Sequence, residues 1–212
     1  MLENDVLYVN PSSLVTFAGL HDMARFMSEP GATTEGLELA ETFLLTARGI
    51  PMIYYGDEIG MMGGEDPENR RDFPGEWSDE ERRQFQSASN RPFQPQGLDA
   101  SRARLLEHIR RLTHLRARLE PLRRGSMIAL AAGEHAFTFA RVTNAASVIV
   151  AINNGLRSES IRCNIAPAHV QDGSVLEDRL GHAPDIHVAG AVFHVDLAPR
   201  SAAVFALKGG RD

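Results

Sequence analysis

The sequence predicts an α/β part followed by an all-β part, and three observations carry this prediction. Residues 14–18 and 50–56 form apolar runs with β-branched members, and a helical pattern lies between them. After Gly125 the composition shifts to short β-type runs, divided by turns that contain Asn, Gly or Pro. The 212 residues are enough for one large domain or two modest ones.

The α/β part reads as strand, helix, strand. The run "LVTFA" (14–18) is continuously apolar, which is typical of a strand buried on both faces of a parallel sheet. Apolar residues at helical spacing predict a helix over 34–48, with a threonine at its start to cap it. The run "IPMIYYG" (50–56) predicts a second strand, with Pro51 tolerated only near its beginning. Short connections predict that the two strands are parallel.

The polar segment 57–100 is too long for a simple connector, and loops of this length in compact domains are usually functional. A short helix is expected within it at about 79–86. An apolar stripe predicts a longer helix over 101–119, capped by Ser101 or Asp99. The later β-type runs predict an antiparallel β-sandwich, so we place the domains at 1–122 and 123–212; the runs are "HAFTFARVT", "SVIVAIN", "SIRCNI", "AVFHVDLA" and "SAAVFALK".

Bulk composition excludes several classes of protein. The net charge of −6 disfavours non-specific nucleic-acid binding, and no apolar run approaches the ~18 residues of a membrane span. One cysteine, Cys163, cannot form an internal disulfide or a Cys-rich zinc site, and we interpret it as a small apolar strand residue. The first residues lack the pattern of a signal peptide, and the compartment stays open between cytoplasm and periplasm.

Candidate chemistry begins at His21 and Asp22, directly after the first predicted strand. Ligands of parallel α/β folds bind at this end of the strands, where a carboxylate can orient a hydroxyl and a histidine can donate to one. A polar turn capped by Asp22 is an equally good interpretation of these two residues alone. A second cluster, Asp57–Glu58 with the acids and arginines of "DPENRRD" (66–72), fits a salt-bridged surface loop at least as well.

Two further patterns favour ordinary explanations. The arginine-rich helix over 101–119 is best explained as a solvated face, because glutamates dilute its charge and no aromatic residue interleaves for base stacking. The remaining histidines show no metal-ligand spacing on a common helix, although His182 and His187 could pair. They are His108, His114, His135, His169, His182, His187 and His194.

Three stretches together resemble the α-amylase family (glycoside hydrolase family 13), in its neopullulanase and cyclomaltodextrinase branch. "LVTFAGLHDMARFMS" resembles the seventh strand of the family's (β/α)8 TIM barrel with its His–Asp motif. "TARGIPMIYYGDEIGM" resembles the eighth strand, and "GGEDPENRRDFPGEW" resembles the loop after it. The resemblance implies the C-terminal part of the barrel, followed by the family's C-terminal β-sandwich domain.

The resemblance also implies roles for five residues. His21 matches the histidine that hydrogen-bonds the sugar in the −1 subsite, and Asp22 matches the third catalytic carboxylate, which supports the oxocarbenium-like transition state. Asp66 and Arg70 match an acid–base pair that helps to hold the −2 sugar. Arg25 matches the motif's arginine, which we group with the substrate-binding residues as structural support. No metal or cofactor follows from these residues; calcium occurs in relatives, but no ligand set here has convincing spacing.

Two departures from the family pattern stand out. Leu20 takes the place of the usual Asn before His–Asp, so an amide has become apolar. The nucleophile and the acid/base, about 5 Å apart in a retaining enzyme, belong to strands that we expect upstream of Met1. We therefore expect a part of an α-glucan hydrolase that is inactive alone and whose cut barrel pairs with the missing segment or self-associates. The alternative is a non-catalytic carbohydrate-binding or scaffold fragment.

Overall fold

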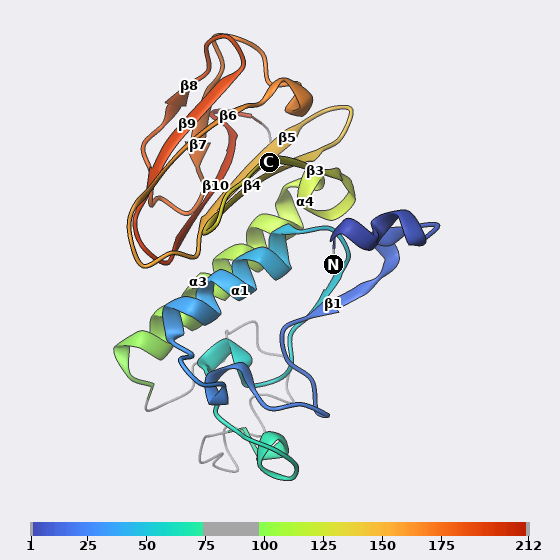
Figure 1. Cartoon of the computed structure of the whole chain (residues 1–212), viewed down its shortest axis with the longest axis vertical. Helices are drawn as coiled ribbons and strands as arrows, with labels where there is room; N and C mark the ends of the chain where they lie inside the picture. The colour runs from blue at the N-terminus through green and yellow to red at the C-terminus, as the bar shows by residue number, and fades with distance from the viewer. Residues whose placement is uncertain (1, 74–97, 211–212) are drawn as a thin grey trace, which may run out of the picture.

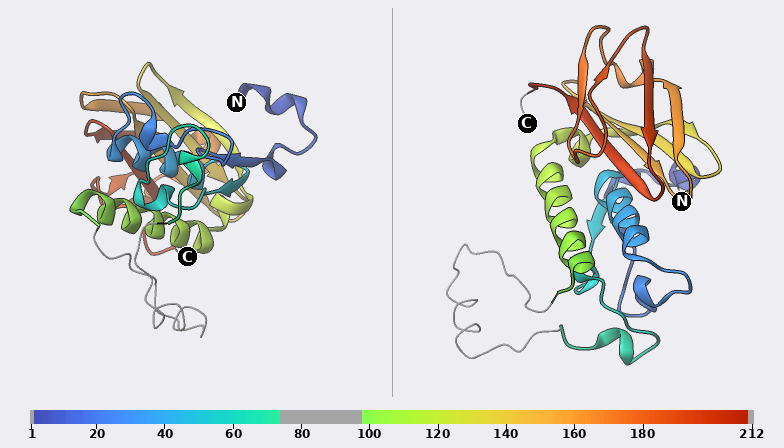
Figure 2. Two further views of the ribbon diagram at one scale, coloured as in Figure 1. Left: turned by 90° about the horizontal axis from the view of Figure 1, so that it is seen from below. Right: turned by 90° about the vertical axis from the view of Figure 1, so that its left-hand side faces the viewer.

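The computed structural model describes residues 2–73 and 98–210 as three stacked layers (Figure 1). A two-layer β-sandwich lies at one end, two parallel helices cover one of its faces, and the loops that carry His21 and Asp22 lie at the far end (Figure 2). The predicted helix at 79–86 lies outside the described residues. No helix in the described part of the chain combines the length and apolarity that crossing a bilayer requires.

The α/β part contains the predicted strand–helix–strand unit. Strands β1 and β2 are parallel, with Val15 opposite Ile50 and Phe17 opposite Met52. The elements of this part are η1 (Leu2–Leu7), η2 (Pro11–Ser13), β1 (Val15–Phe17), η3 (Phe26–Ser28), α1 (Thr34–Thr46), β2 (Ile50–Met52), η4 (Asp57–Ile59), η5 (Glu68–Arg70), α3 (Ala100–Arg118) and α4 (Glu120–Arg124).

The helix caps follow from the sequence. Thr33 begins α1, and its hydroxyl accepts a hydrogen bond from the Gly36 amide at 3.0 Å. Asp99 begins α3, and its carboxylate accepts from the Arg102 amide at 2.9 Å. Helix α1 ends at Thr46, two residues before the predicted end, with Ala47 in an extended conformation.

The apolar strand β1 is only partly covered in this chain, as expected for a strand of a cut barrel. Thr16 is buried, but Val15 and Phe17 are 54% and 41% exposed, and Ile50 of β2 is also exposed. Within the described chain β1 pairs with β2, and the two form a two-stranded sheet. An apolar sequence gives a strand the capacity for burial, but only neighbouring strands and helices can cover it.

The sandwich consists of a six-stranded antiparallel sheet, in the order β3-β4-β5-β10-β7-β8, and the pair β6-β9. Five of these strands match predicted runs, whereas β3, β7 and β8 were not predicted; β7 and β8 are too short to show a period. The strands are β3 (Ser126–Ala132), β4 (Ala136–Val142), β5 (Ser147–Asn153), β6 (Glu159–Asn164), β7 (Val175–Asp178), β8 (Ile186–His187), β9 (Val192–Leu197) and β10 (Ser201–Leu207), with η6 (Ala166–Ala168) between β6 and β7.

The six-stranded sheet is buried on both faces. Residues such as Ala140 and Phe205 face the core between the two sheets. Their neighbours, such as Phe139 and Val204, join a second core with α1, α3 and α4. The boundary that we placed after residue 122 falls within α4, whose Leu122 is fully buried in this second core. The α/β part and the sandwich therefore share one hydrophobic core, and the boundary stays a prediction.

Two arginines tie the C-terminal end of α1 to the rest of the molecule. Arg141 of β4 is buried, and its Nη1 donates to the carbonyls of Thr46 and Ala47 at 2.6 and 2.5 Å. Arg116 of α3 donates to the carbonyls of Leu45, Ala47 and Gly49. These carbonyls have no partner within the helix, and the guanidinium charges also complement the helix dipole.

Candidate active site

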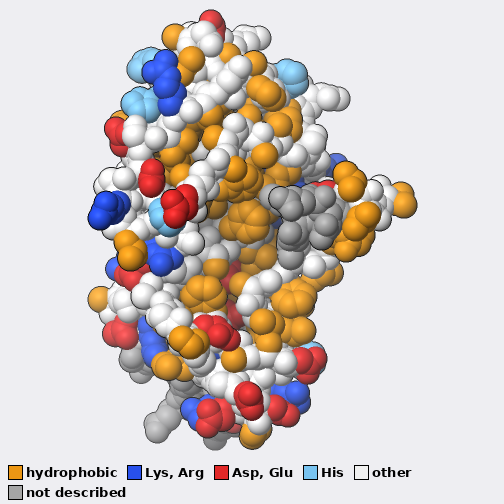
Figure 3. Space-filling view, viewed as in Figure 1, with side chains coloured by type: hydrophobic (Ala, Val, Ile, Leu, Met, Phe, Trp, Pro, Cys, Tyr) orange, Lys and Arg blue, Asp and Glu red, His pale blue; other side chains and the backbone are white. Residues whose placement is uncertain are grey.

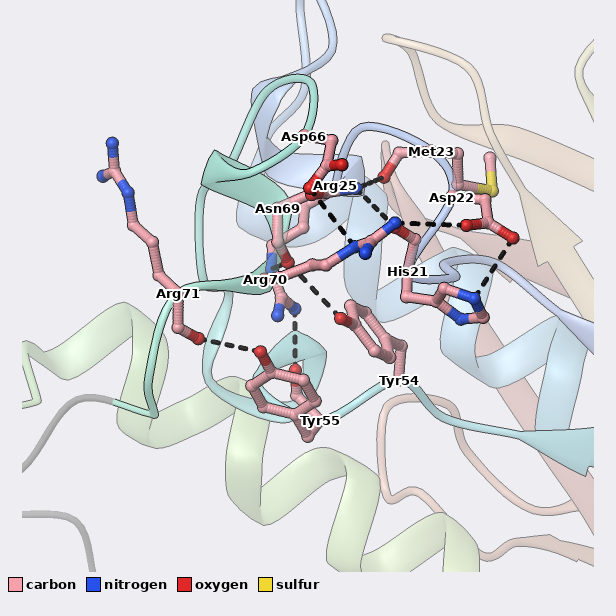
Figure 4. Close-up of polar contacts among 10 residues, drawn as sticks. All are labelled: His21, Asp22, Met23, Arg25, Tyr54, Tyr55, Asp66, Asn69, Arg70 and Arg71. Carbon is pink, nitrogen blue, oxygen red and sulfur yellow. Dashed lines mark hydrogen bonds and ion pairs between the residues drawn. The ribbon is translucent and has the colours of Figure 1, made fainter.

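The turn after β1 presents His21 and Asp22 to solvent. The chain reverses over residues 20–23, where the Met23 amide donates to the Leu20 carbonyl at 3.2 Å. The side chains of His21 and Asp22 are 53% and 63% exposed, and His21 Nε2 lies 3.2 Å from Asp22 Oδ2 (Figure 4). Leu20, which stands in place of the family's Asn, is half-buried.

The loop after β2 brings Asp66 and Arg70 to this pair. Arg70 Nη2 lies 3.3 Å from Asp22 Oδ1, and Arg70 Nε lies 3.4 Å from Asp66 Oδ1. Arg70 Nε also donates to the His21 carbonyl at 3.1 Å. Four of the five residues singled out by the resemblance therefore form one exposed network of polar contacts, although the two segments lie more than 40 residues apart in the chain.

Arg25, the fifth residue, is buried beneath this network at 1% exposure. Its Nη1 donates to the Tyr55 carbonyl at 2.7 Å and to Asp57 Oδ1 at 3.1 Å. The guanidinium also lies 4.5 and 4.8 Å from the ring centroids of Tyr54 and Tyr55, a distance typical of cation–π contacts. Arg25 is thus placed to hold the turn after β1 against the segment after β2.

Asp57 is the buried partner of Arg25. Burial raises the pKa of Asp57 to about 6, although the positive charge of Arg25 opposes this shift. The backbone of Gly19 passes directly over the carboxylate, because a Cβ at that position would lie 2.4 Å from Asp57 Oδ2. A glycine at position 19 therefore lets the turn after β1 sit directly on the Arg25–Asp57 pair.

Glu41 is a second buried acid, on the inward face of α1. It is fully buried, and neither carboxylate oxygen has a hydrogen-bond partner among the described residues. Burial, reinforced by the negative charges of Asp57 and Glu58, raises the pKa of Glu41 to about 8. At neutral pH its carboxyl group is therefore largely protonated.

Asn69 is the residue that sequence reasoning missed. Its side-chain amide is 1% exposed and donates to the carbonyls of His21 at 2.7 Å and Met23 at 3.1 Å. Its own carbonyl accepts from Arg25 Nε at 3.0 Å. An asparagine within a polar loop has no pattern that separates it from a surface residue, so the signal was only its place in "DPENRRD".

The other residues considered from sequence lie away from this network. Cys163 is half-buried in β6, and burial raises the pKa of its thiol, so it is a poor nucleophile. His182 stacks on His108 at 6.4 Å between ring centroids, and it does so rather than pair with His187. Within residues 2–73 and 98–210, no group of three or more side chains is placed to ligate a metal ion.

Comparison with known proteins identifies the class. The family model described as "Alpha amylase, catalytic domain" matches residues 3–123, which is more than half of the chain. The chain therefore belongs to the α-amylase family. Strands β1 and β2 with their helices form the C-terminal part of its (β/α)8 barrel, and an antiparallel sandwich follows.

The chain is similar in sequence to two characterised kinds of enzyme in this family and similar in structure to a third. A cyclomaltodextrinase from Thermoanaerobacter pseudethanolicus is 34% identical over 146 residues, which are 69% of this chain and 22% of that protein. Neopullulanase 2 from Thermoactinomyces vulgaris is 35% identical over 136 residues, 63% of this chain and 20% of that protein. The crystal structure of an Anoxybacillus α-amylase superposes with a TM-score of 0.75 at 26% identity, covering 97% of this chain and 40% of that one. The chain thus spans about a fifth of the length of these two curated relatives.

Proposed function

We propose that this chain carries the sugar-positioning side of the active site of a retaining α-glucan hydrolase that acts on starch, maltodextrin or cyclomaltodextrin. The observation that carries the proposal is the exposed network of His21, Asp22, Asp66 and Arg70 at the ends of two neighbouring barrel strands. In this proposal His21 and Asp22 bind the hydroxyls of the sugar at the bond to be cleaved. Asp66 and Arg70 hold the next sugar.

Asp22 is suited to stabilising positive charge. Its carboxylate is solvent-exposed and paired with Arg70 at one oxygen and His21 at the other, so it is held in place while remaining reachable. An oxocarbenium-like transition state places positive charge on the sugar ring, and a nearby carboxylate lowers its energy. The two buried acids beneath the site are not placed to serve as nucleophile or acid/base: Asp57 is buried and paired with Arg25, and Glu41 is fully buried on α1.

A titration of the 212-residue chain with maltotriose, followed by NMR, tests the proposal. We expect binding at millimolar sugar, with signals of the segment 20–25 and of Arg70 shifting, and loss of that binding in Asp22→Ala. We also expect no release of reducing sugar from maltotriose or a cyclodextrin. Absence of binding would overturn the proposal for this chain, whereas hydrolysis would overturn the assignment of the missing groups to other strands.

The coding DNA distinguishes the enzyme from the alternative, a non-catalytic carbohydrate-binding or scaffold fragment. The enzyme requires an in-frame segment upstream of codon 1 that encodes an Asp and a Glu at strand ends. A reading frame that starts at Met1 would favour the binding module, in which the exposed network holds maltodextrin without cleaving it.

We further propose that the uncovered apolar surface of η1, β1 and β2 contacts other barrel elements or, in the isolated chain, a second copy. Exposed apolar side chains line this side (Figure 3); they are Val6, Leu7, Val9, Val15, Phe17 and Ile50. Patches of this kind mark contact surfaces. Light scattering should show association of the isolated chain, and a monomer across micromolar concentrations would contradict self-association.

A further inference from the structure

The amide of Asn69 is the buried tie between the two loops of the site. Both of its N–H groups are used, one on the His21 carbonyl and one on the Met23 carbonyl. Both partners are acceptors only, so the NH2 group and not the oxygen must face them. Because Asp22 lies between His21 and Met23 in the chain, the amide of Asn69 binds the backbone on both sides of Asp22 (Figure 4).

The neighbouring residue acts on the same turn from outside. Arg70 donates to the His21 carbonyl and pairs with the Asp22 carboxylate, while Asn69 holds the backbone from within. One inward and one outward side chain of η5 therefore set the same turn. Exposed ion pairs such as that of Arg70 are weak and adjustable, whereas a buried pair of hydrogen bonds fixes a geometry.

Asn69 is itself firmly placed. Its carbonyl accepts from the buried Arg25, and a Cβ at Gly63 would lie 2.7 Å from its Cα, so the loop closes tightly there. Its Oδ1 is buried without a hydrogen-bond partner among the described residues. Among the described residues this amide therefore makes its side-chain contacts only through its two N–H donors.

We propose that Asn69 is a positioning residue for sugar binding. By holding the carbonyls before and after Asp22, it fixes where the Asp22 carboxylate and the His21 imidazole meet the glucosyl ring. This inference rests on the proposed function, because the α-glucan is the ligand assumed at that turn. It requires a short side chain with two N–H donors at position 69.

The substitution Asn69→Asp tests this requirement with almost no change of shape. An ionised carboxylate would face two carbonyl oxygens, so both contacts become repulsive. A protonated carboxyl group recovers one donor, and burial favours that form. We expect maltotriose affinity to fall about tenfold at pH 8, as two hydrogen bonds are lost, and to recover toward the wild-type value at pH 5.

The matched control is Asn164→Asp in the sandwich. Asn164 is exposed, and its Oδ1 accepts from the Ala166 amide, a contact that a carboxylate can keep. This variant adds the same charge and should bind maltotriose like wild type from pH 5 to pH 8. A residue that only stabilised the fold would not make sugar affinity depend on pH relative to wild type. If Asn69→Asp does not fold, Asn69→Ala should weaken binding about tenfold without that pH dependence.

The outcomes separate this inference from the proposed function. If Asn69→Asp, or Asn69→Ala in its place, binds as wild type does while Asp22→Ala does not bind, the positioning role is overturned and the function stands. If wild type does not bind maltotriose, the proposed function fails. The NMR signals of the His21 ring and the Met23 amide then test whether Asn69 positions the turn. The inference then requires these signals to shift in Asn69→Asp and not in Asn164→Asp; unchanged signals overturn it.

Discussion

Arginines lie at both ends of the α1–α3 helix pair, but they are buried at one end and exposed at the other. At the sandwich end, Arg141 and Arg116 bind backbone carbonyls and are largely withdrawn from water. At the site end, Arg70 pairs with two exposed carboxylates that solvent can reach. The buried guanidinium of Arg141 is out of reach of a ligand, whereas the exposed Arg70 and its carboxylates can exchange partners. The first end is built for stability, and the second leaves its charges open to a ligand.

Arg141→Met should have the largest effect on stability, because it removes the buried contacts at the C-terminal end of α1. Burial lowers the pKa of Arg141 to about 10, so it is still charged at neutral pH. Its loss removes charged hydrogen bonds to Thr46, Ala47 and Gly125 and leaves buried carbonyls unpaired. We expect the free energy of unfolding to fall by about 4 kcal/mol in urea titrations followed by circular dichroism.

Arg162→Met is the control for this prediction. Arg162 is exposed on β6, so the same substitution should change the free energy of unfolding by less than about 0.5 kcal/mol. Equal effects of the two substitutions would mean that the ties at the end of α1 contribute no specific stability.

Arg25→Met tests the buried support beneath the site. It leaves Asp57 without its cation, and breaking a buried ion pair from one side should destabilise by about 3 kcal/mol at pH 8. The pKa of Asp57 is already raised to about 6, and losing Arg25 raises it further. Below that pKa the carboxyl is neutral, so the loss should be smaller at pH 5. Adding Asp57→Asn should restore part of the stability at pH 8, and failure to do so would contradict this account.

Glu41→Gln removes a buried titratable group whose ionised form has no hydrogen-bond partner among the described residues. The folded pKa of about 8 lies above the unfolded value, so stability is full below about pH 4.5 and declines as pH rises toward 8. One proton can produce a slope of at most about 1.4 kcal/mol per pH unit. In urea titrations, the free energy of unfolding of the variant should not show this decline between pH 5 and 7.5. Relative to wild type, the variant should therefore gain more than about 1 kcal/mol between these two pH values.

Glu35→Gln is the matched control on the same helix. A backbone hydrogen bond lowers the pKa of the exposed Glu35, so this group is ionised in both states above pH 5. Its substitution should therefore leave the pH dependence between 5 and 7.5 as in wild type. A wild-type slope that survives in Glu41→Gln would show that another group causes it.

Arg70→Gln should have the smallest effect on stability and a clear effect on the ligand. Its ion pairs are exposed, so we expect a change below about 0.5 kcal/mol in the free energy of unfolding. Maltotriose affinity should nevertheless fall, since Asp22 and Asp66 lose their shared cation. Arg102→Gln, which removes an exposed pair with Asp99, should alter neither quantity. Arg70→Gln with wild-type affinity would remove Arg70 from the site.

Much of this organisation was predictable from sequence, because it depends on local patterns. The apolar periods over 34–48 and 101–119 and their capping residues predicted the two helices, which span Thr34–Thr46 and Ala100–Arg118, and the strand–helix–strand order predicted the parallel pair. The resemblance brought together His21, Asp22, Asp66 and Arg70, which the structure places in one network.

What could not be predicted depends on contacts between distant segments. Asn69, Arg141 and Glu41 look like ordinary polar residues in their local sequence, and only packing buries them. The uncovered faces of β1 were expected only because the resemblance indicated a cut barrel, since an apolar run by itself does not reveal whether its neighbours are present. Burial depends on contacts between elements of the folded chain. A single sequence therefore predicts burial only where the hydrophobic period of a helix or strand marks the face that packs inward.

The shared core has a consequence for how this part of the molecule can be exchanged between relatives. A sandwich transplanted alone would bring Arg141 and Phe139 but leave behind the helix carbonyls and leucines that receive them. The functional module for recombination is therefore the sandwich together with α1, α3 and α4. A chimera joined in the loop before α1 should keep its helices and sheet in register, whereas one joined after α4 must form the shared core between helices and a sheet from two different proteins.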